Sequence, residues 1–160
     1  METKKMGAIY GEIANILNEI IPDKWNKIYL YGEVLDDFRE VYFYFDSAIS
    51  KDIVYGHDIP RTYNLDKKTY RQLLRELTKF IVDLHVEYKE NNDIVWTNLT
   101  FLIDSSGKFN IKFNYDDILK SPFSSGERQI IWEYEVLDIQ PINDDHKEII
   151  DKYLKSKDDK

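Results

Sequence analysis

The first twenty residues carry apolar side chains at spacings of three and four. The repeating positions are Met6, Ile9, Tyr10, Ile13, Ile16, Leu17 and Ile20. This spacing predicts an amphipathic helix, and Pro22 lies just beyond its end. A longer pattern of the same kind follows Asp66, a suitable N-cap, and stops at 91–93. Its expected buried stripe contains Tyr70, Leu73, Leu74, Leu77, Phe80, Ile81, Leu84 and Tyr88.

Elsewhere the hydrophobic period changes to two, which is typical of half-buried strands. The four alternating segments are 25–35, 40–47, 95–104 and 108–115. Asp36-Asp37 separates the first two segments, and a Ser-Ser-Gly turn at 105–107 separates the last two. The chain is therefore expected to form two hairpins. A weaker strand is expected over 52–55, before a loop that contains Gly56 and Pro60.

Two shorter apolar patterns predict helices near the C-terminus. The first carries Ile130, Ile131, Tyr134 and Leu137, and the second carries Ile149, Ile150, Tyr153 and Leu154. Pro141 is expected to break the first, and Asn143 is suited to cap the second. Residues 156–160 are rich in Lys and Asp and are expected to fray.

The order of elements favours an α+β fold, because hairpins dominate and no βαβ unit repeats. We expect an antiparallel sheet built from two hairpins and packed with N-terminal, central and C-terminal helices. No linker or internal repeat interrupts the 160 residues. A single domain is therefore expected over residues 1–160.

The composition narrows the possible partners. The net charge is −8 and the sequence pI is near 4.9, which disfavours direct binding of nucleic acid because phosphates need clustered Lys and Arg. No cysteine is present, so disulfides and Cys-based zinc sites are excluded. No stretch approaches the ~18 apolar residues of a membrane span. We expect a soluble, cytoplasmic protein with no membrane partner.

The motifs of common enzymes are missing from the sequence. The histidines His57, His85 and His146 form no metal-binding spacing, and the six glycines form no phosphate-binding loop. His85 follows the apolar stripe of a helix and is expected on the surface, while His57 is expected to make a local hydrogen bond. We therefore expect no catalysis, no cofactor and no bound metal.

The doublet Asp116-Asp117 follows the last alternating segment and has three possible roles. It can form a turn or cap, contact a partner, or bind a metal. Adjacent residues on a strand point to opposite faces, so the doublet is a poor chelate by itself. The turn or cap is favoured, with partner contact second.

Negative charge is concentrated in the first hairpin. Five acids against one arginine give residues 33–46 a local balance of −4. The candidate partner-binding residues are Asp36, Asp37, Glu40, Tyr42, Tyr44 and Asp46, with Asp116 and Asp117 as a second patch. Acids steer a basic partner, and tyrosines supply contact area. The alternative is that a later helix covers the tyrosine face. Residues 66–79 are basic instead.

Four segments together resemble the YezG-like immunity family, which includes staphylococcal proteins of the EsaG type. They are IIPDKWNKIYLYGEV, EVYFYF, WTNLTFLIDSSGKFNIKFNYDDI and ERQIIWEYEVL, and they extend from about Ile20 to Pro141. The resemblance implies an α+β antitoxin that binds and neutralises a cognate nuclease toxin exported by type VII secretion. Two other readings stay open: a metal-dependent hydrolase that uses scattered Asp, Glu and His, and a homodimeric interaction module.

Overall fold

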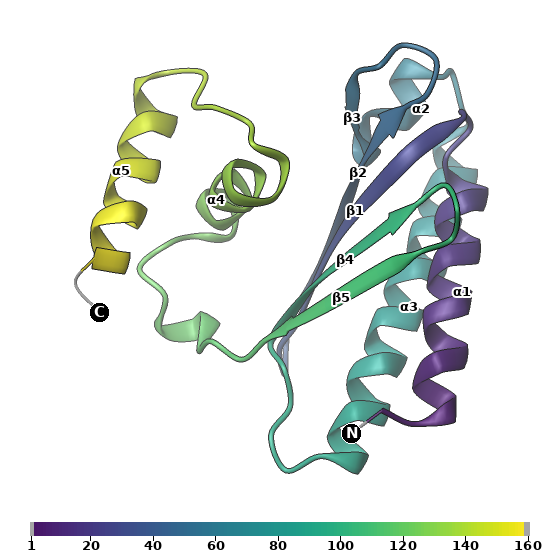
Figure 1. The fold of residues 1–160 in the computed structure, drawn as a ribbon, viewed down its shortest axis with the longest axis horizontal. Helices are drawn as coiled ribbons and strands as arrows, with labels where there is room; N and C mark the ends of the chain where they lie inside the picture. The colour runs from purple at the N-terminus through teal and green to yellow at the C-terminus, as the bar shows by residue number, and fades with distance from the viewer. Residues whose placement is uncertain (1, 159–160) are drawn as a thin grey trace. The chain divides into compact units, whose positions relative to one another are not determined.

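The first predicted helix is present as α1 (Lys4–Ile20) in the computed structural model, which describes residues 2–158. These residues form two compact units, the first ending at Asp116 and the second beginning at Asp117. The expectation of a single domain over residues 1–160 stays a prediction, and each unit is described by itself. Figure 1 gives the order of the elements along the chain.

The two long helices of the first unit begin at side-chain caps. The Thr3 hydroxyl accepts a hydrogen bond from the backbone N–H of Met6 at the start of α1. The Asp66 carboxylate accepts hydrogen bonds from two backbone N–H groups at the start of α3 (Lys67–Asn91), as the sequence predicts. Such caps satisfy backbone donors that a helix leaves without partners, which is why both helices begin where they do.

The sheet has five antiparallel strands in the order β3-β2-β1-β4-β5. Their bounds are β1 (Trp25–Val34), β2 (Arg39–Ser47), β3 (Ile53–Tyr55), β4 (Asn98–Asp104) and β5 (Phe109–Asn114). The two predicted hairpins are β1–β2 and β4–β5, and pairing of β1 with β4 joins them. At the β4–β5 turn Gly107 has a φ of 90°, which favours glycine.

Helices α1 and α3 lie side by side on one face of this sheet (Figure 1). That face carries the residues of one alternation, including Ile28, Leu30, Phe43, Phe45 and Phe101, all fully buried. The helices supply Ile13, Leu17, Leu77 and Ile81, which are also fully buried. Burial of this much apolar surface is the main stabilising contribution to the first unit. The predicted α+β class and antiparallel hairpins are confirmed.

The segment between β3 and α3 differs from the prediction. A loop was expected around Gly56 and Pro60, but the chain forms η1 (Gly56–Asp58) and then α2 (Ile59–Thr62). Pro60 lies in the first turn of α2, where its missing N–H costs no helical hydrogen bond. Proline therefore marks a helix start here, not a break.

The second unit contains η2 (Ile118–Lys120), α4 (Ser125–Leu137) and α5 (Asp144–Asp158). Ser124 and Glu127 form a capping box at α4, and the Asn143 side chain accepts from the backbone N–H of His146 at α5. A small cluster of Phe123, Ile131 and Ile150 joins the two helices.

The ends of α4 and α5 depart from the sequence reading. α4 ends at Leu137, four residues before the predicted break at Pro141, because Asp138 takes a left-handed conformation. α5 continues as helix through residues 156–158, where fraying was expected. Residues 159–160 lie outside the described part of the chain.

Candidate partner-binding surface

The turn between β1 and β2 presents two of the predicted acids. Asp36 and Asp37 are exposed there, between Val34 and Arg39, which are paired across the hairpin. The backbone N–H of Leu35 donates to the carbonyl of Phe38 at 2.8 Å and closes the turn. The turn therefore holds both carboxylates out at one end of the sheet.

Long-range backbone bonds bring Asp116 to the same end. The N–H of Val34 donates to the carbonyl of Thr97 at 3.0 Å, and the N–H of Thr97 donates to the carbonyl of Asn114 at 2.9 Å. The Thr97 hydroxyl also donates to the backbone carbonyl of Asp116 at 2.7 Å. The end of β1, the start of β4 and the end of β5 are thus neighbours. Asp116 therefore lies at the same end of the sheet as the β1–β2 turn.

A further acid lies in the connection from α3 to β4, whose Thr97 is bonded to Val34 and Asn114 at this end of the sheet. Asp93 is exposed there beside Ile94. From the sequence it was predicted only to end the helix before it. We call Asp36, Asp37, Asp93 and Asp116 the acidic sheet end. In the sequence, Asp93 beside the large apolar residue Ile94 was the only indication of this site. The sequence did not indicate the whole surface, because its acids come from separate segments of the chain.

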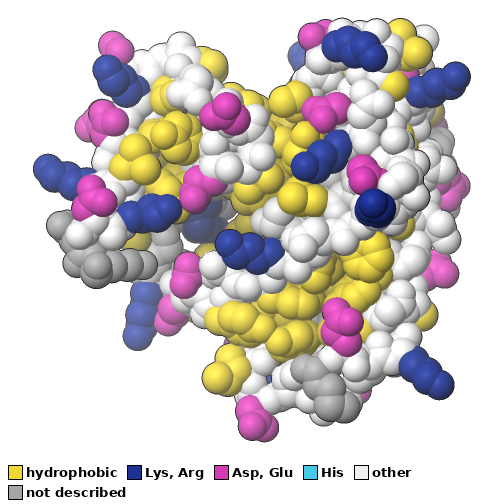
Figure 2. Space-filling model, in the orientation of Figure 1, with side chains coloured by type: hydrophobic (Ala, Val, Ile, Leu, Met, Phe, Trp, Pro, Cys, Tyr) yellow, Lys and Arg dark blue, Asp and Glu magenta, His cyan; other side chains and the backbone are white. Residues whose placement is uncertain are grey.

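Apolar side chains accompany these acids. Phe38, Ile94 and Tyr115 are 39%, 70% and 47% exposed. Figure 2 also shows a band of hydrophobic side chains over the area where β5 runs in Figure 1. A polar rim with apolar and aromatic contact area is typical of protein-binding surfaces. The acidic sheet end therefore combines charge with contact area.

The hairpin separates Asp46 from the other predicted acids. Asp46 pairs with Lys27 near the opposite end of the sheet and accepts a hydrogen bond from the Tyr29 hydroxyl at 2.8 Å. The six residue steps of extended strand from Glu40 to Asp46 amount to about 20 Å. Asp46 is therefore bound within the fold and does not share a patch with Asp36 and Asp37.

Two further acids of the first hairpin are not freely exposed. Glu33 is only 1% exposed and accepts a hydrogen bond from the Tyr31 hydroxyl at 2.7 Å. Glu40 lies opposite Glu33 in the β1–β2 register and is half-buried. Of the acids in residues 33–46, Asp36 and Asp37 in the turn are therefore the exposed ones, and Glu40 as a contact residue stays a prediction.

Tyr42 and Tyr44 are buried, with 2% and 3% of their surface exposed. The ring of Tyr42 stacks on Tyr31 at 4.8 Å between centroids, and Tyr44 lies 5.0 Å from Tyr55. Burial, with a smaller contribution from Tyr31, raises the pKa of Tyr42 far above its ordinary value. Both tyrosines lie in a buried aromatic row on this sheet face, and their role as contact residues stays a prediction.

Asp117 opens the second unit and acts locally. Its backbone carbonyl accepts from the N–H of Lys120 at 3.2 Å, and its carboxylate lies 3.9 Å from the Lys120 ammonium group. The side chain of Asn114 accepts from the backbone N–H of Asp116 at 2.8 Å. Both aspartates therefore occupy turns after β5, while their carboxylates remain exposed.

No metal-binding group emerges from residues 2–158, where no three His, Asp or Glu side chains converge. His85 is half-buried rather than on the surface, and its Nε2 lies 3.0 Å from the carbonyl oxygen of Trp96. His57 Nδ1 lies 2.7 Å from the Tyr70 hydroxyl oxygen. Each histidine thus has a structural partner, and the hydrolase reading gains no support from this geometry.

These two histidines predict a pH dependence of stability. Burial lowers the pKa of both His57 and His85 from the usual value of about 6.5, so the unfolded chain binds protons more readily than the native protein. The stabilisation is present above about pH 6.5 and is lost as the pH falls. We expect the free energy of unfolding in urea to decrease between pH 7.5 and pH 5.5. In His57→Gln/His85→Gln the decrease should be smaller, and an unchanged slope would contradict this origin.

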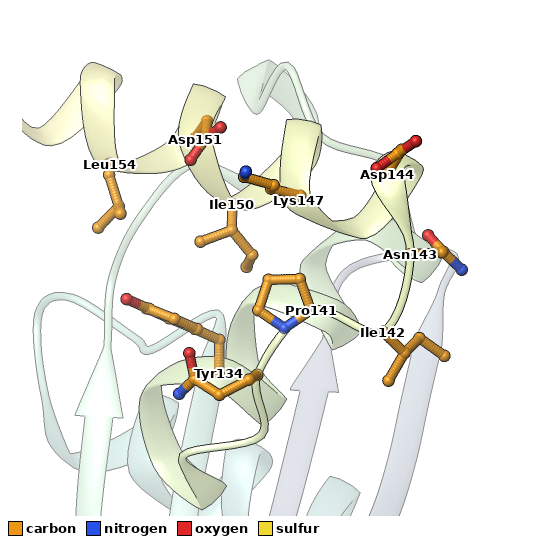
Figure 3. Close-up of a pocket in the computed structure, with 10 residues that line it drawn as sticks. Tyr134, Pro141, Ile142, Asn143, Asp144, Lys147, Ile150, Asp151 and Leu154 are labelled. Carbon is orange, nitrogen blue, oxygen red and sulfur yellow. The ribbon is translucent and has the colours of Figure 1, made fainter.

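The second unit has an open pocket of about 520 Å³ between the end of α4 and α5. Figure 3 shows Tyr134 and Pro141 on one side, with Ile150 and Leu154 of α5 opposite them. Asp144, Lys147 and Asp151 lie at its rim. Nothing in this lining pairs a nucleophile with a base, so the pocket suggests no reaction.

The sequence is similar to known immunity proteins. Residues 6–151 match the family described as "Immunity protein YezG-like". Immunity protein YezG of Bacillus subtilis is 48% identical over 149 residues, covering 93% of this chain and 99% of the relative. YezG of Bacillus spizizenii is 39% identical over 160 residues, covering 100% and 99%.

A staphylococcal relative extends the comparison. The type VII secretion system protein EsaG of Staphylococcus aureus is 30% identical over 138 residues, covering 86% of this chain and 85% of its own. No helix within residues 2–158 is long and apolar enough to cross a membrane. The family match covers residues 6–151, and the two Bacillus relatives are 48% and 39% identical over 99% of their own length. The chain therefore belongs to the YezG-like immunity protein family.

Proposed function

We propose that this chain is a cytoplasmic immunity protein, without enzymatic activity, that binds and neutralises a nuclease toxin exported by type VII secretion. Membership of an immunity protein family supports the protective role. The name of the staphylococcal relative supports the link to type VII secretion. The nuclease target rests on the charge of the surface described above.

The acidic sheet end is the observation that carries the target class. A nuclease holds phosphates in a positively charged groove, so an inhibitor that covers the groove gains from clustered carboxylates. Asp36, Asp37, Asp93 and Asp116 supply that charge from three segments of the chain. Exposed Phe38, Ile94 and Tyr115 supply the apolar contact that charge alone lacks. The toxin groove is therefore occluded rather than distorted at a distance.

Identification of the toxin is the first experiment. A tagged copy of the chain is captured from its native organism, and the bound proteins are identified by mass spectrometry. We expect a large protein whose C-terminal domain degrades nucleic acid. That domain is then purified, and its activity on DNA and RNA is titrated with the chain.

The titration distinguishes the proposed function from the alternatives. Complete inhibition near one equivalent supports an immunity protein, and weaker inhibition at excess substrate supports occlusion of the groove. A hydrolase would instead act on substrates without the toxin, and its activity would respond to added divalent metal. If an excess of the chain leaves the nuclease fully active, the proposed function is wrong.

A further inference from the structure

Helix α3 and strand β2 form an open groove of about 530 Å³ within the first unit. Arg71, Arg75 and Lys79 line it from one face of α3, at the spacing of three and four residues that places side chains together. Arg39 lines it from β2. Strand β3 pairs with β2 only from Tyr44 to Asp46 and does not extend to Arg39.

The groove is rimmed by positive charge in a chain whose net charge is −8. Lys79 pairs with Asp83 at 2.8 Å, one turn further along α3. Within residues 2–158 the structure shows no ion pair for Arg39, Arg71 or Arg75, all of which are exposed. Arg71 Nε donates to the backbone carbonyl of Lys67 at 3.3 Å, which leaves the rest of its guanidinium group available. Three guanidinium groups around one groove, none in an ion pair with the described part of the chain, indicate an anionic partner, since arginine binds carboxylates in a bidentate geometry.

The floor of the groove is apolar. Leu74 and Val82 line it and are half-buried, and the Thr78 hydroxyl is satisfied by the carbonyl of Leu74 at 2.9 Å. Val86, one turn beyond Val82, is 49% exposed and extends the apolar stripe. From Leu74 to Val86 the stripe measures about 18 Å along the helix. A solvent-facing apolar stripe of this length between cations is unusual for a helix that already buries its opposite face.

We propose that this groove binds an acidic amphipathic helix of a partner protein. The apolar side of that helix covers Leu74 and Val82, and its carboxylates pair with Arg39, Arg71 and Arg75. An apolar floor favours a protein segment over a nucleic acid backbone, which has no apolar face to bury. Since its charge is opposite to that of the acidic sheet end, the groove takes a different ligand from a basic nuclease groove. The inference therefore does not rest on the proposed function.

A peptide of this chemistry provides the test. The probe is a fluorescein-labelled peptide, ELEELLEELEELLEE, whose binding to the full chain is measured by fluorescence anisotropy. We expect Arg71→Glu/Arg75→Glu to weaken binding at least about tenfold, as is typical for loss of paired charges in an interface. The control Lys24→Glu/Lys112→Glu changes the net charge equally at exposed sites outside the groove and should bind like the native chain.

Two further probes separate the contributions. A peptide with serine at every leucine position retains the charge but should bind at least about tenfold more weakly, because the floor is then left uncovered. An oligothymidylate should not bind in a manner that depends on Arg71 and Arg75. The proposal is overturned if the leucine peptide does not bind, if both double variants bind it equally, or if the serine peptide or the oligothymidylate binds the groove as well. Circular dichroism checks that each variant is folded.

Discussion

Replacement of Asp36, Asp37, Asp93 and Asp116 by asparagine should slow association with the cognate toxin by about 10- to 100-fold at low salt. These carboxylates are exposed and come from three segments that the sheet brings together at one end. They attract a basic partner over distances longer than direct contact. The expected loss therefore appears mainly in the association rate, measured by stopped-flow fluorescence or surface plasmon resonance.

Salt should reduce this difference between native and variant proteins. The Debye length is about 10 Å at 0.1 M ionic strength and about 3 Å at 1 M, so exposed charges no longer steer the toxin at high salt. The dissociation rate should change less, since the apolar residues Phe38, Ile94 and Tyr115 remain. Protection of cells that express the toxin should fall in parallel with the association rate.

Two control variants test the location of the surface. Glu12→Gln/Glu19→Gln/Asp52→Asn/Glu76→Gln removes the same number of exposed charges elsewhere in the first unit. Asp46→Asn removes an acid near the opposite end of the sheet that is bound to Tyr29. Both should associate at nearly the native rate. If the four-residue control slows association as much as the asparagine variant, only net charge matters and recognition lies on another face.

Trp96→Ala should lower the free energy of unfolding by about 3–5 kcal/mol, the usual cost of truncating a large buried aromatic residue. Trp96 is 0% exposed, just before β4. Its ring stacks on Phe113 at 5.6 Å and meets the His85 ring edge-on at 4.8 Å. Removal of the ring leaves a cavity between α3 and β5, the two elements that carry these neighbours. Urea denaturation followed by circular dichroism measures the change.

Trp96→Phe is the matched control for this prediction. The indole N–H of Trp96 is buried and has no hydrogen-bond partner among the described residues, so phenylalanine removes an unsatisfied donor while it keeps an aromatic ring. We expect a loss much smaller than that of Trp96→Ala. If the free energy of unfolding of Trp96→Ala lies within about 1 kcal/mol of that of the native protein, the surrounding residues have filled the space of the lost ring and the prediction is wrong.

The secondary structure was predictable because its causes are local. Apolar spacing alone predicted α1 and α3, and Asp66 was recognised as a cap because its side chain needs only the next three residues. The alternation of β1 and β2 and the turn at Asp36-Asp37 likewise required only neighbouring residues. The prediction from sequence was wrong at Pro60, because proline occurs both in loops and in the first turn of helices. Pro60 lies in the first turn of α2 and not in a loop.

The candidate surface was only partly predictable, because a strand pattern distinguishes two faces but does not say which face is covered. The sequence marked Tyr42 and Tyr44 as one face, yet only the folded chain decided that both are buried. It also could not tell that Asp116 and the α3–β4 connection that carries Asp93 meet the end of β1, since that depends on the pairing of β1 with β4.

By itself the sequence determined the helices, the hairpins, the overall charge and the resemblance to an immunity family. The tertiary structure decided which charged segments lie together: the β1–β2 turn with the connections that carry Asp93 and Asp116, and Arg39 of β2 with Arg71 and Arg75 of α3 around one groove. The physical reason is that helices and turns depend on contacts within a few residues. Strand order and helix packing depend on contacts between residues far apart in the chain, and no local pattern encodes them.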